Sequence, residues 1–175
     1  GDQMPGAVHE ELDIKILILY ALRRLSGPVD PSDLYDMCLT SGAVNYFDYS
    51  GCLADLVERQ MISQDEEEFY RITKKGRQNV EAVESSLPYS LRSKMDRLLL
   101  PIDEKIQRAA LVRTAVHKEK DAIIADLSMS DGVGTLIDLH ILCADESQAS
   151  IIRKNFKHHS EEYYQRFIQE LSKEE

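Results

Sequence analysis

The stretch from Leu53 to Gly76 constrains the possible fold more than any other part of the chain. It starts with apolar residues at helical spacing, which predict the end of a helix. Two short apolar segments follow, at 61–62 and 69–72, and the polar turn between them is typical of a strand pair. Thr73 can then cap a further helix, which would begin with two lysines and a glycine. The stretch therefore predicts a helix, a two-stranded ribbon and the start of a second helix in immediate succession.

Two helices are predicted before this stretch, and a third leads into it. Apolar residues recur at helical spacing from about His9 to Leu25 and cover a wide arc, so we expect the first helix to pack against more than one neighbour. The segment 26–28, Ser-Gly-Pro, would end it. Asp30 before a proline can cap a second helix, and Asn45 can open the third.

A linking segment follows the ribbon. The helix that starts at Thr73 should run to about Ser85, and Pro88 marks a boundary. Pro101 should kink or interrupt the helix beyond that boundary. Apolar residues of this last helix recur at spacings of four, three and four, which is typical of one helix packed on another and predicts an interface with a second copy of the chain. The residues of this predicted dimer interface are Leu91, Met95, Leu98 and Ile102.

From about Ala110 the apolar pattern changes from a helical period to a period of two. It predicts three strands, at 110–117, 122–129 and 133–143, whose short connections make an antiparallel β-meander. A helix at about 147–171 would cover one face of this sheet. We therefore predict an α+β fold with a first domain at 9–87, a linking helix at 88–109 and a β-meander domain with its C-terminal helix at 110–175.

The composition bears on location and chemistry. No apolar run approaches the roughly 18 residues of a membrane helix, and no leader precedes residue 9, so we expect a cytoplasmic protein without a membrane partner. The widely spaced Cys38, Cys52 and Cys143 favour free thiols over a zinc site or a disulfide. No nucleophile elbow, H-E-x-x-H or phosphate loop is present. We expect no enzyme, no cofactor and no bound metal.

The charge is unevenly distributed. The net charge of −10 divides into −8 for residues 1–88, with 8 Lys+Arg against 16 Asp+Glu, and −2 for residues 89–175, with 13 against 15. Phosphate contacts by lysine and arginine supply most of the non-specific affinity of a protein for DNA. The half of the chain with the helix-and-ribbon pattern is therefore the half that is less suited by charge to bind DNA.

The pattern in residues 9–86 resembles a winged helix-turn-helix domain. Its most specific part is Leu-x-x-Leu-Val at 53–57, then Ile62, then Tyr-x-Ile-Thr-x-x-Gly at 70–76. Together with Asn-Tyr-Phe at 45–47 and the predicted meander, the whole chain resembles an uncharacterised bacterial winged-helix family whose members are labelled transcriptional regulators. The resemblance implies a DNA-binding type of fold, a regulatory role and no known ligand.

Carried onto this chain, the resemblance implies a third helix placed in duplex DNA, with Asp48 restricted to a cytosine amino group. We expect a homodimer, because one small module rarely gives enough affinity or half-site specificity. The ribbon tip at 65–68, Asp-Glu-Glu-Glu, would instead repel phosphates. This acidity favours an alternative, a protein-interaction module on the same scaffold. The resemblance puts the base-contacting residues at the exposed start of the third helix: Asn45, Tyr46, Tyr49 and Ser50. Four basic residues at the ribbon's return would either hold phosphates or form a solvated face: Arg71, Lys74, Lys75 and Arg77.

A third class of function depends on the predicted meander. His117, Asp126, Asp138 and His140 would share one face of the sheet if the predicted strand pairing holds. Two imidazoles and two carboxylates are suited to acid–base chemistry or to a divalent metal. An ordinary solvated face is the simpler interpretation, because antiparallel sheets often leave one side in water.

Overall fold

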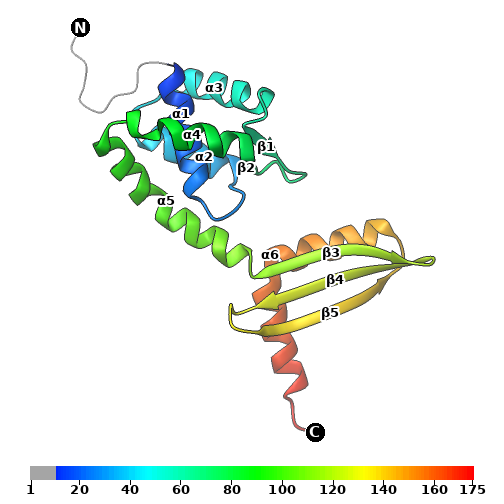
Figure 1. Ribbon diagram of the computed structural model, residues 1–175. Coiled ribbons are helices and arrows are strands. Elements are labelled where there is room, and N and C mark those ends of the chain that lie inside the picture. Colours follow the sequence, from blue (N-terminus) through cyan, green and yellow to red (C-terminus); the bar gives the residue numbers. More distant parts are fainter. Residues whose placement is uncertain (1–10) are drawn as a thin grey trace. The chain divides into compact units, whose positions relative to one another are not determined.

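The computed structural model describes residues 11–175 and divides the chain into two compact units. Unit 1 ends at Gln107, and unit 2 comprises Arg108–Glu175. The described residues form six α-helices and two antiparallel sheets, one of two strands and one of three (Figure 1). The prediction of an α+β fold is therefore confirmed. No helix within residues 11–175 is long and apolar enough to span a membrane.

Unit 1 begins with three helices, continues with a short ribbon and ends with two more helices. Each cap that the sequence predicts is formed: Asp30 accepts a hydrogen bond from the Ser32 amide at 2.8 Å, and Asn45 accepts one from the Asp48 amide at 3.0 Å. The elements are α1 (Glu11–Arg24), α2 (Pro31–Thr40), α3 (Tyr46–Glu58), β1 (Ile62–Gln64), β2 (Tyr70–Ile72), α4 (Lys74–Val83), the 3₁₀ turn η1 (Glu84–Ser86) and α5 (Tyr89–Ala109).

Helix α1 is the centre of the unit 1 core. Every residue from Ile16 to Leu22 is buried, because α2, α3, α4 and β2 all pack around it. The wide apolar arc of this helix thus packs against several neighbours, as its sequence predicts. The ribbon is extended by Val29, whose backbone exchanges two hydrogen bonds of 2.9 Å with Tyr70.

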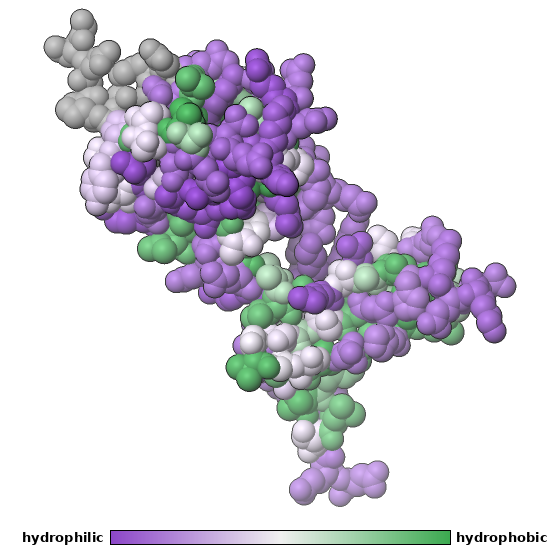
Figure 2. Space-filling view, viewed as in Figure 1, coloured by the Kyte–Doolittle hydropathy of each residue, from purple (hydrophilic) through white to green (hydrophobic). Residues whose placement is uncertain are grey.

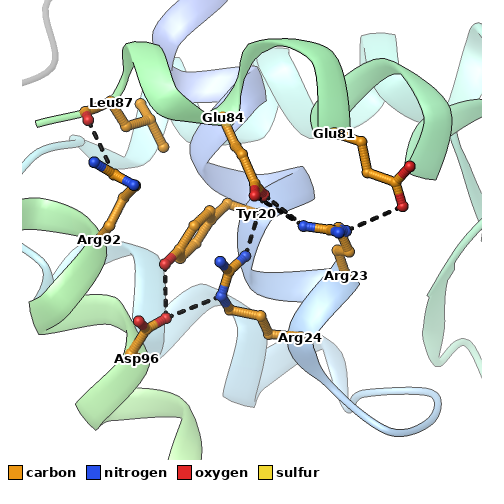
Figure 3. A network of polar contacts seen from close by, with 8 residues as sticks. All are labelled: Tyr20, Arg23, Arg24, Glu81, Glu84, Leu87, Arg92 and Asp96. Carbon is orange, nitrogen blue, oxygen red and sulfur yellow. Dashed lines mark hydrogen bonds and ion pairs between the residues drawn. The ribbon is translucent and has the colours of Figure 1, made fainter. Parts of the chain in front are cut away.

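Helix α5 is held on α1 by a polar network (Figure 3). Asp96 of α5 accepts a hydrogen bond of 2.8 Å from the Tyr20 hydroxyl and pairs with Arg24 at 3.2 Å. Arg23 and Arg24 also pair with Glu84, which lies just after α4. Burial and the Asp96 carboxylate together raise the pKa of Tyr20 to about 12, so this hydroxyl stays a donor.

The apolar stripe of α5 packs inside its own unit, contrary to the predicted dimer interface. Leu91 is 3% exposed and Met95 0%, and both belong to the core around α1. Leu98 and Ile102 are partly buried against the same core. The spacing correctly indicates a buried helix face, but this face packs into the core of its own unit. Pro101 lies inside α5 without interrupting it.

Unit 2 is a three-stranded meander with one long helix. The strands are β3 (Val112–Glu119), β4 (Ala122–Ser130) and β5 (Thr135–Cys143), and they pair in the order β3-β4-β5. Helix α6 (Glu146–Leu171) covers one face, with Ala149 and Phe156 packed on buried β4 residues (Figure 1).

The ends of two strands differ from the prediction. Residues 118 and 119 belong to β3 instead of the turn, because Lys120 adopts a positive φ of 55° and closes a tighter hairpin. Val133 and Gly134 lie in the next turn instead of in β5. There the Asp131 carboxylate accepts hydrogen bonds from both of their amides at 2.8 Å.

Candidate nucleic-acid interface

The start of α3 presents an exposed surface. Asn45, Tyr46, Phe47 and Asp48 are all exposed, and Ser50 is half-buried. Asn45 is committed to the helix end, since its side chain accepts from the Asp48 amide and donates to the Asp48 carboxylate at 2.8 Å. Of the four predicted base-contacting residues, Tyr46 and Ser50 remain available at the surface without a hydrogen-bonding role in the cap.

Tyr49 corrects the predicted site. Its side chain is 3% exposed, and its ring packs edge-on against Tyr35 with centroids 5.6 Å apart. One residue in α3 turns the side chain by about 100°, so Tyr49 lies on the core side while its neighbours face outward. Among the described residues its hydroxyl is a buried polar group with no hydrogen-bond partner. Burial also raises the pKa of Tyr49. This residue supports the helix and is not a surface contact.

Aromatic and acidic residues surround the start of α3. Tyr46 is 53% exposed and Phe47 83%, and their rings lie edge-to-face at 5.5 Å. Beside them is a shallow depression of about 370 Å³, which is lined by Glu11, Ile14, Phe47, Asp48, Gly51 and Cys52. The two carboxylates make this depression a poor place for a phosphate and a better one for a basic or apolar group.

The connection from α3 to α4 explains the Thr-x-x-Gly pattern. The Thr73 hydroxyl donates to the Gln60 carbonyl at 2.7 Å and accepts from the Gly76 amide at 3.1 Å. The Thr73 amide donates to the Met61 carbonyl at 3.0 Å. Gly76 lies so close to that carbonyl that a Cβ atom would overlap its oxygen. These contacts fix the start of α4 against the end of α3.

Four basic residues gather where the ribbon returns into α4. Arg71 lies on β2, and Lys74, Lys75 and Arg77 lie in the first turn of α4; all four are exposed. Lys75 donates to the Arg59 carbonyl at 2.9 Å, which places it beside the end of α3. Within residues 11–175, Arg71, Lys74 and Arg77 form no ion pair. Their charges are available to an anionic partner.

The acidic ribbon tip is a separate, ordered turn. Asp65 accepts hydrogen bonds of 2.9 Å from the amides of Glu67 and Phe69, and Glu68 adopts a positive φ of 69°. The four acidic residues at 65–68 are exposed. Because the tip projects from β1 and β2 at the end away from the Lys74 turn, the acidic tip and the basic turn of α4 occupy opposite ends of the ribbon, with Arg71 on the strand between them. Figure 2 shows that the visible face of unit 1 is largely hydrophilic.

Lys15 of α1 makes a contact with α3 that the sequence pattern does not reveal. Its ammonium group contacts the Asp55 carboxylate of α3, and Arg59 pairs with the same carboxylate at 2.8 Å. The hydrogen bond from Lys15 and the charge of Arg59 lower the pKa of Asp55. The spacing of four between Asp55 and Arg59 indicates their pair, whereas the contact from Lys15 depends on the packing of α1 on α3.

The structure also brings together the four polar residues predicted on the meander. Asp126 on β4 contacts His140 on β5 at 2.6 Å and His117 on β3, while His140 lies 3.4 Å from Asp138. Hydrogen bonding to Asp126 raises the pKa of both histidines. The imidazole nitrogens therefore point at carboxylates, and no group of residues arranged to hold a metal ion occurs within residues 11–175. The arrangement is a charged network on a solvated sheet face.

Comparison with known families relates the chain to an uncharacterised domain family. Residues 14–171 match the model of the family described as "Domain of unknown function (DUF4364)". The chain belongs to this family, and the predicted relation to an uncharacterised domain family is confirmed. Searches among curated proteins and among solved structures found no match.

Proposed function

We propose that this protein is a homodimeric transcriptional regulator whose unit 1 is a winged helix-turn-helix domain that binds duplex DNA. The observation that carries the proposal is the basic group at residues 71–77, fixed beside the end of α3 by the Thr73 and Lys75 hydrogen bonds. In winged-helix proteins a helix enters the major groove while the ribbon and neighbouring turns meet the backbone. The order of α2, α3, β1, β2 and α4 supports the same assignment.

In this proposal α3 enters the major groove with its N-terminal end. Ser50 and the Tyr46 hydroxyl are the groups there that can hydrogen-bond base edges. Arg71, Lys74, Lys75 and Arg77 hold phosphates on one side of the groove. The ribbon tip points away from the backbone, because its four carboxylates would be repelled. With a net charge of −10, binding depends on this one basic group.

Charge reversal tests the proposal. Binding of purified protein to a pool of random duplexes should weaken by at least about tenfold in R71E/K74E. The matched control is R97E/K154E, which changes the net charge equally at two exposed residues outside the basic group. Equal weakening by both variants would show a general charge effect and would contradict the assigned interface.

A second candidate function is a protein-interaction module on the same scaffold. The exposure of Phe47 and Tyr46 beside Glu11 and Asp48 favours it, since an aromatic surface rimmed by acids suits a basic protein partner. Two results together would favour this candidate. The wild-type protein would bind no duplex at low salt, and it would capture a partner that the Phe47→Asp variant fails to capture.

A further inference from the structure

The two edge strands of the unit 2 sheet differ in how well their side chains prevent pairing with a further strand. Strand β5 pairs with β4 on one side, and within residues 11–175 no strand pairs with its other side (Figure 1). The opposite edge, β3, carries Arg113, Lys118 and Glu119, and charged residues of this kind protect an edge from further pairing. Over nine residues β5 carries one carboxylate and one histidine among mainly apolar residues. It is the unprotected edge.

The sequence of β5 is complementary to itself. Residues 136–142 read Leu-Ile-Asp-Leu-His-Ile-Leu, and they are symmetric about Leu139 except that Asp138 corresponds to His140. In an antiparallel pair of identical strands centred on residue 139, each residue faces the one at the same distance on the other side of the centre. Leucine then faces leucine, isoleucine faces isoleucine, and Asp138 faces His140.

The exposed residues of β5 fit this pairing. On the open sheet face Leu136 is 40% exposed and Leu142 is 71% exposed, and these two would cover each other across a twofold axis. Asp138 and His140 lie on the same face. His140 is already oriented by its hydrogen bond to Asp126, so its ring stays in the row that Asp138 of the partner subunit would complete. Figure 2 shows hydrophobic surface at the β4–β5 turn, just before Leu136.

We infer that two copies of this chain associate through antiparallel pairing of their β5 strands, centred on Leu139, to form one six-stranded sheet. Each copy supplies three strands. Backbone hydrogen bonds between the two edges give the association strength, and the facing pairs on both sides fix the register. The inference names the partner that the homodimer in the proposed function requires, and to that extent it rests on the proposed function.

Paired charges at positions 136 and 142 test the register. The L136K/L142K variant places lysine opposite lysine, whereas L136E/L142K places glutamate opposite lysine with equal loss of apolar area. Sedimentation of the wild type should show a dimer. The dissociation constant should rise by at least about tenfold in L136K/L142K relative to L136E/L142K. A monomeric wild type, or equal dimerisation of two folded variants, would overturn the inference.

Cross-linking tests the same register without added charge. In the Leu139→Cys variant the two new thiols face each other, and mild oxidation should join the subunits. In the Leu136→Cys control each thiol faces Leu142 of the partner subunit and lies roughly 20 Å from its own copy, so oxidation should give no covalent dimer. Equal cross-linking of both variants, or none in either, would contradict pairing centred on Leu139. The native cysteines are buried and contribute equally to both samples.

These measurements separate failure of the interface from failure of the proposed function. Sedimentation and oxidation are done without DNA, and R71E/K74E should dimerise as the wild type does because its substitutions lie in unit 1. A β5-paired dimer that binds no DNA would keep the interface and refute DNA binding. A DNA-binding protein that stays monomeric, or dimerises without the register effects, would refute the interface alone.

Discussion

At the scale of single residues, the most constrained position is Gly76. The Cβ of any other residue would overlap the Met61 carbonyl oxygen, which already accepts a hydrogen bond from the Thr73 amide. Glycine is therefore required for close backbone approach and not for an unusual φ angle. The position matters for the proposed function because the same contacts hold the basic turn at 74–77 beside α3.

We predict that Gly76→Ala lowers the free energy of unfolding by about 1–3 kcal/mol, since the backbone must shift to relieve the overlap. The matched control is Gly51→Ala on α3, where a Cβ would meet no atom within 4 Å. The control should raise stability by about 0.5–1 kcal/mol because alanine favours a helix. Urea unfolding of the three proteins measures both effects, and similar stabilities for the two variants would contradict the packing described.

Loss of the hydroxyl group should affect the free energy of unfolding differently at two buried tyrosines. Tyr20→Phe removes the hydrogen bond to Asp96 and should cost about 1–2 kcal/mol. Tyr49→Phe removes a buried hydroxyl that lacks a partner in the described structure, so it should be neutral or stabilising. Thermal or urea unfolding checks both. A larger loss for Tyr49→Phe than for Tyr20→Phe would mean that the roles are reversed.

At the scale of elements, helix spacing predicts which face of a helix is buried but not which element packs against it. The caps at Asp30, Asn45 and Thr73 depend on local backbone chemistry, and all three form as the sequence indicates. The stripe on α5 shows only that one helix face is buried, and it does not distinguish the core of its own unit from a second copy. Tyr49 shows the same limit, because an aromatic residue near a helix start can face the core or the solvent.

In the meander, by contrast, the alternation of side chains along each strand predicts which distant residues share one face of the sheet. Alternation along β3, β4 and β5 puts His117, Asp126, Asp138 and His140 on one face, and the structure has them there. Parity alone could not show that Asp126 lies between both imidazoles, since that depends on the register and on the rotamers. The contribution of Lys15 to α3 likewise depends on tertiary packing and has no local pattern.

The histidine network predicts a pH dependence for the stability of unit 2. Asp126 of β4 raises the pKa of His117 of β3 and His140 of β5, and Glu119 and Asp138 act in the same direction. The resulting stability is fully present below pH 6.5, the ordinary pKa, and is lost as the pH rises through the raised values. His140 and His117 in turn lower the pKa of Asp126, so its contribution is lost when the pH falls below about 3.8.

Thermal unfolding at one protein concentration between pH 5 and 9 measures this dependence. The wild-type melting temperature should fall more steeply than that of Asp126→Asn as the pH rises from about 6.5. Asparagine keeps the shape of the side chain but loses the charge that favours the imidazolium forms. Parallel profiles for the two proteins would show that Asp126 does not hold the histidines protonated.

At the scale of the whole molecule, an acidic protein with a net charge of −10 is proposed to bind an anionic ligand. Unit 1 contributes the basic turn at 71–77, while exposed carboxylates lie elsewhere in the unit, including the four at the ribbon tip. One small module rarely gives enough affinity or half-site specificity for duplex DNA, which is why the proposed regulator acts as a dimer. The β5 pairing would supply that second copy.

The salt dependence of duplex binding by the wild-type protein measures whether the basic group contacts phosphates. Fluorescence anisotropy with a labelled duplex should show that the logarithm of the association constant falls linearly with the logarithm of salt concentration. Four basic residues on phosphates predict a slope of about −3 to −4 for each protomer. Absence of binding at about 50 mM salt, or an affinity that does not change with salt, would contradict the account.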